Sequence, residues 1–98
     1  MNKLSLIKPI IKTNVFDKCF ISSITDDSRD VQKNSLFVAR QGIGSHGNEY
    51  VDEAIQRGAS CIISDQSFKK EIDIPIYFLN NLEDQILTIL FRFHELIE

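Results

Sequence analysis

The chain has 98 residues, of which 43% are hydrophobic and 26% are charged. This length allows one domain with a single small core, and the composition is that of a globular protein rather than a disordered one. The net charge of −3 and the pI near 5.3 leave no basic footprint for nucleic acid. No stretch approaches the roughly 18 apolar residues of a membrane-spanning helix, and no signal-peptide cleavage site is apparent. We therefore expect a cytoplasmic protein that binds neither nucleic acid nor membranes.

Short apolar segments between polar turns predict several strands. These segments are Phe20–Thr25, Ser35–Arg40, Ser60–Asp65 and Ile74–Leu79. The last segment contains Pro75, which indicates an edge strand or a strand start because proline has no N–H to donate. Helical segments lie between and after these strands. The sequence therefore predicts an α/β domain with a small mixed, largely parallel sheet flanked by helices.

One helix is predicted at Asn48–Arg57, where apolar residues such as Val51 recur at helical spacing and form one buried face. Glu53 falls on the opposite face and is expected to point outward. Gly47–Asn48 offers an N-cap, and Gly58 offers a residue of positive φ that ends the helix.

A second helix is expected after the last strand, with Asn81 as its N-cap. Its apolar residues are Leu82, Ile86, Leu87, Ile89, Leu90, Phe91, Phe93 and Ile97. This apolar face is wider than one small sheet needs. It indicates either a deeply buried helix or a surface that meets another domain or another chain.

A polar turn and a glycine loop are the candidate binding elements. Ser28 and Arg29 carry groups that hydrogen-bond phosphates or hydroxyls, or else Ser28 caps the turn and Arg29 pairs with Asp27 or Asp30. The loop Gly42–Gly47 precedes a helix start, where unpaired N–H groups and the helix dipole favour a phosphorylated ligand. The alternative is a flexible loop whose glycines only supply positive φ.

Other kinds of site lack their sequence signals. There is no GxxxxGK[ST] for ATP, no GxSxG, and no ligand spacing between His46 and His94 that would indicate zinc. The adjacent carboxylates Asp26–Asp27 point to opposite sides of an extended segment, which argues against a catalytic pair. Cys19 and Cys61 have no CxxC spacing and are predicted to be reduced cysteines in or near the core.

The order of motifs from Thr25 to Asp65 closely resembles the N-terminal domain of the Mur ligases. The matching motifs are DSR at Asp27–Arg29, LFVA at Leu36–Ala39, the loop Gly42–Gly47, the aromatic Tyr50, AI at Ala54–Ile55 and GA at Gly58–Ala59. Within the family the chain is most similar to the MurE type, and the tail PIYFLNNLEDQILTILFRFHE supports this. The MurF type shares the DSR and LFVA motifs.

The resemblance implies a domain that binds UDP-MurNAc-L-Ala-D-Glu through its nucleotide end. The contacts it implies are Asp26 and Ser28 in the turn and Ile43, Gly44 and Ser45 in the loop. Asp26 places a carboxylate where relatives often have a neutral residue. Such a carboxylate can accept a hydrogen bond from ribose or uracil, but it would repel a diphosphate.

The resemblance further implies an ATP-dependent ligase of peptidoglycan synthesis, hence of cell-wall growth, cell shape and division, which adds 2,6-diaminopimelate or L-lysine. The family's central ATP-binding and C-terminal domains have no counterpart here, so residues 1–98 are expected to be a single substrate-binding domain, a fragment or a truncated form. We expect no catalytic residue, metal or cofactor in this chain, and no catalysis by it alone, because ATP and Mg²⁺ act in the full-length enzyme.

The helix at residues 82–97 would then pack on the missing central domain or on another chain. Two alternatives stay open. In the first, the chain would be the corresponding domain of a MurF-type ligase. In the second, it would be a non-catalytic interaction module that kept the fold.

Overall fold

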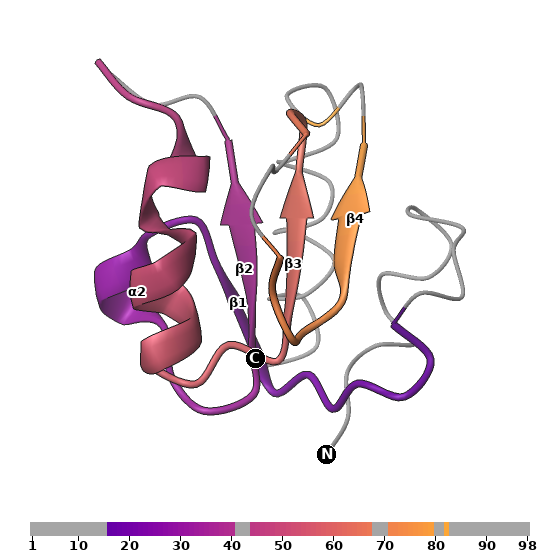
Figure 1. The fold of residues 1–98 in the computed structure, drawn as a ribbon. Helices are drawn as coiled ribbons and strands as arrows, with labels where there is room; N and C mark the ends of the chain where they lie inside the picture. Colours follow the sequence, from indigo (N-terminus) through magenta and orange to yellow (C-terminus); the bar gives the residue numbers. More distant parts are fainter. Residues whose placement is uncertain (1–15, 41–43, 68–70, 80–81, 83–98) are drawn as a thin grey trace.

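The computed structural model describes residues 16–40, 44–67, 71–79 and 82. The strands are β1 (Ser23–Thr25), β2 (Ser35–Ala39), β3 (Cys61–Ser64) and β4 (Ile76–Phe78). The helical elements are the 3₁₀ helices η1 (Ser28–Asp30) and η2 (Gly47–Tyr50) and the α-helix α2 (Val51–Gln56). The strands form one sheet in the order β1-β2-β3-β4, and every neighbouring pair is parallel (Figure 1). The α/β class is confirmed, and among the described strands the sheet is parallel rather than mixed.

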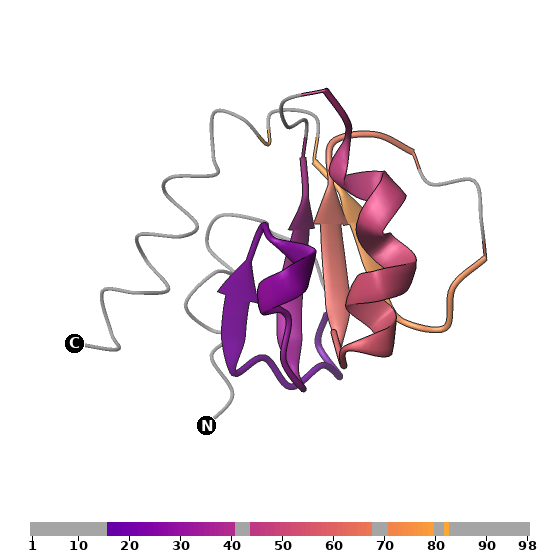
Figure 2. The ribbon, with the colours of Figure 1, turned by 90° about the vertical axis from the view of Figure 1, so that its left-hand side faces the viewer.

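The central strands β2 and β3 are buried along their whole length, as expected for parallel strands covered on both faces. Alternate residues point to opposite faces, so Leu36 and Val38 join one apolar cluster while Phe37 joins the other. The first cluster also contains Phe16 and Leu82. The second lies beneath α2, which covers one face of the sheet (Figure 2).

The helix at Asn48–Arg57 is present, but it starts differently from the prediction. Its first turn is the 3₁₀ helix η2, and only residues Val51–Gln56 are α-helical. Gly58 has a φ of +110° just after the helix, as predicted. A Cβ at that position would lie 2.8 Å from Lys33 Cα, so close packing against the β1–β2 connection also requires a glycine.

The edge strands are shorter than predicted. β1 starts at Ser23 rather than Phe20, and the N–H of Ser22, just before the strand, donates to Asn34 O at 2.9 Å. β4 starts at Ile76, immediately after Pro75, and its one neighbour among the described strands is β3. Pro75 therefore marks a strand start on an edge strand, as predicted.

Cys19 and Cys61 are buried in the first apolar cluster and form no disulfide, which confirms the prediction of reduced cysteines in the core. Of the predicted helix at residues 82–97, only Leu82 belongs to the described residues, and its side chain is fully buried. The rest of that helix, and its apolar face, lie outside the described residues. Within the described part of the chain, no helix is long and apolar enough to cross a membrane.

Candidate ligand-binding site

Two adjacent hollows lie where the chain leaves the carboxyl ends of β1 and β2. Their lining begins at Asp26, one residue after β1, and Arg40, one residue after β2. The larger hollow, about 490 Å³, is lined by Asp26, Asp27, Ser28, Arg29, Tyr50 and Glu53. The smaller, about 110 Å³, is lined by Asp26, Arg40, Ser45, Gly47 and Tyr50. Ligands of parallel α/β sheets bind at this edge, and the larger volume suits a small-molecule ligand.

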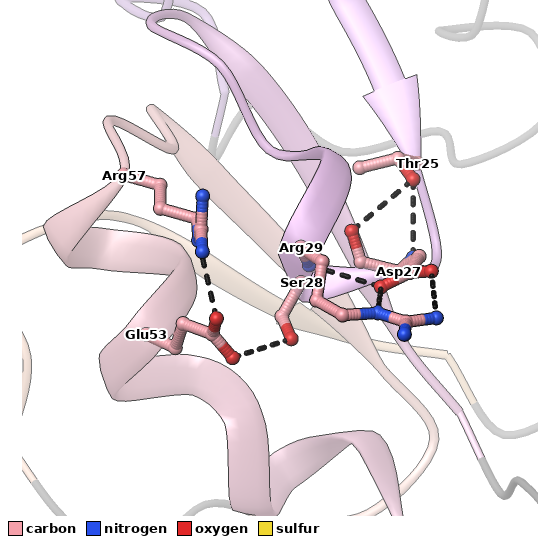
Figure 3. A network of polar contacts seen from close by, with 6 residues as sticks. All are labelled: Thr25, Asp27, Ser28, Arg29, Glu53 and Arg57. Atoms are coloured by element: carbon pink, nitrogen blue, oxygen red, sulfur yellow. Dashed lines mark hydrogen bonds and ion pairs between the residues drawn. The ribbon is translucent and has the colours of Figure 1, made fainter.

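The turn after β1 is held by its own side chains. Thr25 Oγ1 accepts a hydrogen bond from Asp27 N–H at 3.0 Å (Figure 3). The Asp27 carboxylate accepts from Arg29 three times, from the backbone N–H at 2.9 Å, Nε at 3.0 Å and Nη2 at 2.8 Å. These bonds, the guanidinium first, lower the pKa of Asp27 to about 2. Arg29 was predicted either to bind a ligand or to pair with Asp27 or Asp30, and in this structure it pairs with Asp27.

Ser28 is buried beside the larger hollow, and its hydroxyl crosses to α2. Ser28 Oγ donates to Glu53 Oε1 at 2.8 Å, and Arg57 Nε donates to Glu53 Oε2 at 3.1 Å (Figure 3). The hydrogen bond from Ser28, followed by that from Arg57, lowers the pKa of Glu53. Glu53 was expected on the outward face of the helix, and its side chain is 38% exposed. Its carboxylate also reaches Ser28 in η1 and lines the larger hollow, a contact that the outward position did not predict.

Asp26 lines both hollows and pairs with Arg40, whose Nε lies 2.9 Å from Asp26 Oδ2. With the Asp27–Arg29 and Glu53–Arg57 pairs, each carboxylate that lines the larger hollow has an arginine partner. The guanidinium groups nearest the site are therefore already engaged by carboxylates.

The glycine loop contributes Ser45 to the smaller hollow, where its hydroxyl lies 3.2 Å from the Tyr50 hydroxyl. Gly44 has a φ of +83°, so it supplies the positive φ expected of this loop. It does not line either hollow. Ile43 lies outside the described residues.

The helix start after this loop is closed by protein groups. Gly47 N–H donates to Arg40 O at 2.8 Å, and Glu49 N–H donates to His46 O at 3.0 Å. Asn48 N–H donates to His46 Nδ1 at 2.9 Å, so His46 is the cap in place of the predicted Gly47–Asn48. Three amides at the helix start that were expected to be open to a phosphate are therefore paired within the protein.

His46 and Asn48 also fasten the helix start to the end of β3. Because His46 Nδ1 accepts from Asn48 N–H, the ring proton sits on Nε2, which contacts Asp65 Oδ1. Ser64 Oγ donates to Asn48 Oδ1 at 2.7 Å, and Asn48 Nδ2 donates to Gln66 O at 3.3 Å. The Asn48 amide is directed toward β3.

Comparison with known proteins identifies the family of this chain. The sequence model described as "Mur ligase family, catalytic domain" matches residues 20–85, more than half of the chain. The chain belongs to the Mur ligase family.

Relatives in the Mur ligase family include proteins named UDP-N-acetylmuramoyl-L-alanyl-D-glutamate–2,6-diaminopimelate ligase. That of Oceanobacillus iheyensis is 29% identical over 79 residues, covering 81% of this chain and 16% of the relative. That of Lactiplantibacillus plantarum is 30% identical over 81 residues, covering 83% and 15%. Among solved structures, the MurF ligase of Thermotoga maritima in complex with ADP matches with a TM-score of 0.57 and 25% identity, covering 68% and 15%. The chain thus spans about a sixth of the length of these Mur ligases.

Of the residues predicted to bind the ligand of a Mur ligase, Asp26 and Ser28 meet in the larger hollow, and Ser45 joins Asp26 in the smaller one. Sequence reasoning missed Tyr50 and Glu53 as site residues. Tyr50 was noted only as a family motif, and no local pattern links Glu53 to Ser28. In the described ranges, no group of three or more His, Cys, Asp or Glu side chains is placed to hold a metal ion.

Proposed function

We propose that this chain is the UDP-substrate-binding N-terminal domain of a MurE-type ligase, a UDP-N-acetylmuramoyl-L-alanyl-D-glutamate–2,6-diaminopimelate (or L-lysine) ligase of peptidoglycan synthesis in the cytoplasm. The observation that carries the proposal is the pair of hollows at the carboxyl edge of β1 and β2, where Asp26, Ser28 and Ser45 lie. The names of the curated Mur ligase relatives support the MurE type.

In the proposed enzyme, ATP and Mg²⁺ act outside these residues. The sequence contains no phosphate loop of the GxxxxGK[ST] kind. The carboxylates at the site are each paired with arginine and do not form a metal-ligand cluster. We assign formation of an acyl phosphate and attack by the incoming amine to other parts of the enzyme, as the resemblance to the Mur ligases implies. These residues hold the nucleotide end of UDP-MurNAc-L-Ala-D-Glu.

The corresponding domain of a MurF-type ligase is a second candidate, favoured by the likeness to the Thermotoga maritima MurF ligase. Binding of the same nucleotide is expected for either type. The two types differ in the peptide that the nucleotide sugar carries, so assignment requires activity assays of the complete enzyme with each peptide.

The test is an NMR titration of the 98-residue chain with UDP-MurNAc-L-Ala-D-Glu, UMP and AMP. We expect shifts at residues 26–29 and 44–50 with both uridine ligands and not with AMP. A domain that contacts one end of its substrate is expected to bind with Kd on the order of 1 mM, about −4 kcal/mol.

Two matched variants test whether the ligand binds in the hollows. Tyr50→Leu removes an aromatic side chain that lines both hollows, whereas Phe78→Leu removes a similarly exposed aromatic from β4. We expect Tyr50→Leu to weaken UMP binding severalfold and Phe78→Leu to leave it unchanged. A folded protein without shifts at millimolar nucleotide, or with equal shifts for AMP, would contradict the proposal.

A further inference from the structure

The hydrogen bond between Ser28 and Glu53 fixes the direction of the Ser28 hydroxyl. A serine hydroxyl has one proton to donate and two lone pairs with which to accept. Ser28 Oγ lies 2.8 Å from Glu53 Oε1, and an ionised carboxylate only accepts, so the proton points to Glu53. Arg57 on the other carboxylate oxygen stabilises the ionised form. Toward a ligand, the Ser28 oxygen can therefore act only as a hydrogen-bond acceptor through its lone pairs.

The three carboxylates that line the larger hollow have the same preference for hydrogen-bond donors. Asp26, Asp27 and Glu53 present carboxylate oxygens, which accept hydrogen bonds. Arg29, the cation among the lining residues, is held by both Asp27 oxygens through bonds of 3.0 and 2.8 Å. A phosphate here would meet lone pairs and like charges. It would have to draw the guanidinium away from its carboxylate.

We propose that Glu53 is a specificity-determining positioning residue, which holds Ser28 as a hydrogen-bond acceptor so that the larger hollow takes hydroxyl or imide N–H groups and excludes phosphates. The inference rests on the proposed nucleotide-binding function and deepens it. The hollow takes the neutral nucleoside part of the ligand, and its phosphates lie outside this hollow. Glu53 acts through Ser28, so the variants must separate that role from the simple presence of a negative charge.

The experiment measures Kd for uridine and for inorganic pyrophosphate by NMR shifts at residues 26–29. In the wild-type protein we expect uridine to bind at these residues and pyrophosphate to leave them unshifted. In Glu53→Gln the side-chain amide can donate to Ser28 Oγ, which frees the hydroxyl proton for an anion. We expect pyrophosphate affinity relative to uridine to rise about tenfold, the size of one charged-group hydrogen bond.

Control variants separate the positioning role from the loss of charge. Glu49→Gln removes the same charge from an exposed position on η2 that lines neither hollow, and we expect no change in the affinity ratio. In the double variant Ser28→Ala/Glu53→Gln, the gain for pyrophosphate should disappear because the hydroxyl is absent. Dispersion of the amide spectrum and the urea midpoint check that each variant is folded.

Three outcomes count against the inference. Pyrophosphate binding at residues 26–29 of the wild-type protein as tightly as uridine would overturn it without any variant, while leaving nucleotide binding intact. A gain that persists in the double variant would assign the effect to charge alone and overturn the positioning role. An absence of uridine shifts in every protein would remove the proposed function, and the inference would fall with it.

Discussion

Asp27 organises the turn that forms one wall of the larger hollow. It is the N-cap of η1, and its carboxylate holds Arg29 through the backbone N–H and the guanidinium. A serine-containing motif thus owes its conformation to the aspartate before it. The same contacts leave Ser28 directed toward Glu53 rather than toward its own turn.

The Asp27 pair predicts a dependence of stability on acidity. The pKa of Asp27 falls from its ordinary 3.8 to about 2 in the folded chain. A group with a lowered folded pKa contributes stability that is fully present above the unfolded pKa and is lost as pH falls through the folded pKa. Asp27→Asn keeps a capping oxygen but removes the charge. We therefore expect wild type to be more stable than Asp27→Asn near neutral pH, with the difference shrinking from about pH 4 to about pH 2.

Urea midpoints over that pH range measure the difference between the two proteins. The effect should be small because Arg29 is 80% exposed and solvent screens the pair. Asp73→Asn, a change at an exposed aspartate before β4, is the matched control and should show no such trend. A difference between wild type and Asp27→Asn that stays constant down to about pH 2 would contradict the assignment.

At the scale of elements, the site depends on how closely η2 approaches the end of β2. Gly47 N–H donates to Arg40 O at 2.8 Å, and a Cβ on Gly47 would lie 2.7 Å from Ala39 Cα and 2.8 Å from Arg40 N. Backbone atoms cannot yield as a flexible side chain can. The glycine is therefore required by packing between two elements, and Gly47 lines the smaller hollow as a result.

Gly47→Ala is expected to destabilise the fold by about 1–3 kcal/mol, the usual range for forced overpacking. Gly44→Ala is the matched control, since Gly44 has a φ of +83° with nothing within 4 Å of an added Cβ. It should lose about 1 kcal/mol from backbone strain alone. Denaturant unfolding followed by circular dichroism gives both values. If Gly44→Ala proves as damaging as Gly47→Ala, the close approach of η2 to β2 is not what requires the glycine.

The sequence predicted best those elements whose ends are set by their own residues, and less well those whose ends are set by contacts with other elements. The ranges of β2 and β3 were predicted to within one residue at each end, because strands buried on both faces read as continuous apolar runs. The edge strands β1 and β4 were predicted too long, because their ends depend on hydrogen bonds to a single neighbour. The helix starts as the 3₁₀ helix η2, with Gly47 close to the end of β2, and this contact between distant residues is not encoded in a local pattern.

In the candidate site, some residues were predicted from the sequence, whereas their hydrogen-bond partners were not. The resemblance carried by the order of motifs named Asp26, Ser28 and Ser45, and the structure brings these three to the two hollows at the carboxyl edge of β1 and β2. The partners of these side chains were not predictable. Glu53 lies 25 residues from Ser28, and its helical periodicity indicated only an outward position. Hydrogen bonds between elements appear only once the sheet register brings the turn and α2 together.

At the scale of the whole molecule, the sheet separates two apolar clusters. The one beneath α2 includes Phe37 and Ile62, and the one on the opposite face includes Leu36, Ile63 and both cysteines. Cys61 sits on the central strand β3 and is fully buried, and burial raises the pKa of its thiol. A thiolate nucleophile therefore cannot form at Cys61 without opening the fold. Its reactivity should report on unfolding of the domain.

We expect Cys61 in the native chain to react with a thiol reagent at least about a thousandfold more slowly than in urea, since a stability near 5 kcal/mol leaves very little of the chain open. The variant Cys19→Ala leaves Cys61 as the single thiol, so the absorbance of a released chromophore follows one site. Below the unfolding midpoint, the logarithm of the rate should rise linearly with urea, with the slope of global unfolding, because Cys61 is fully buried on β3, the strand that both apolar clusters share. A rate that does not depend on urea in the native range would mean that Cys61 becomes accessible through a local opening, and the two clusters would then not unfold as one unit.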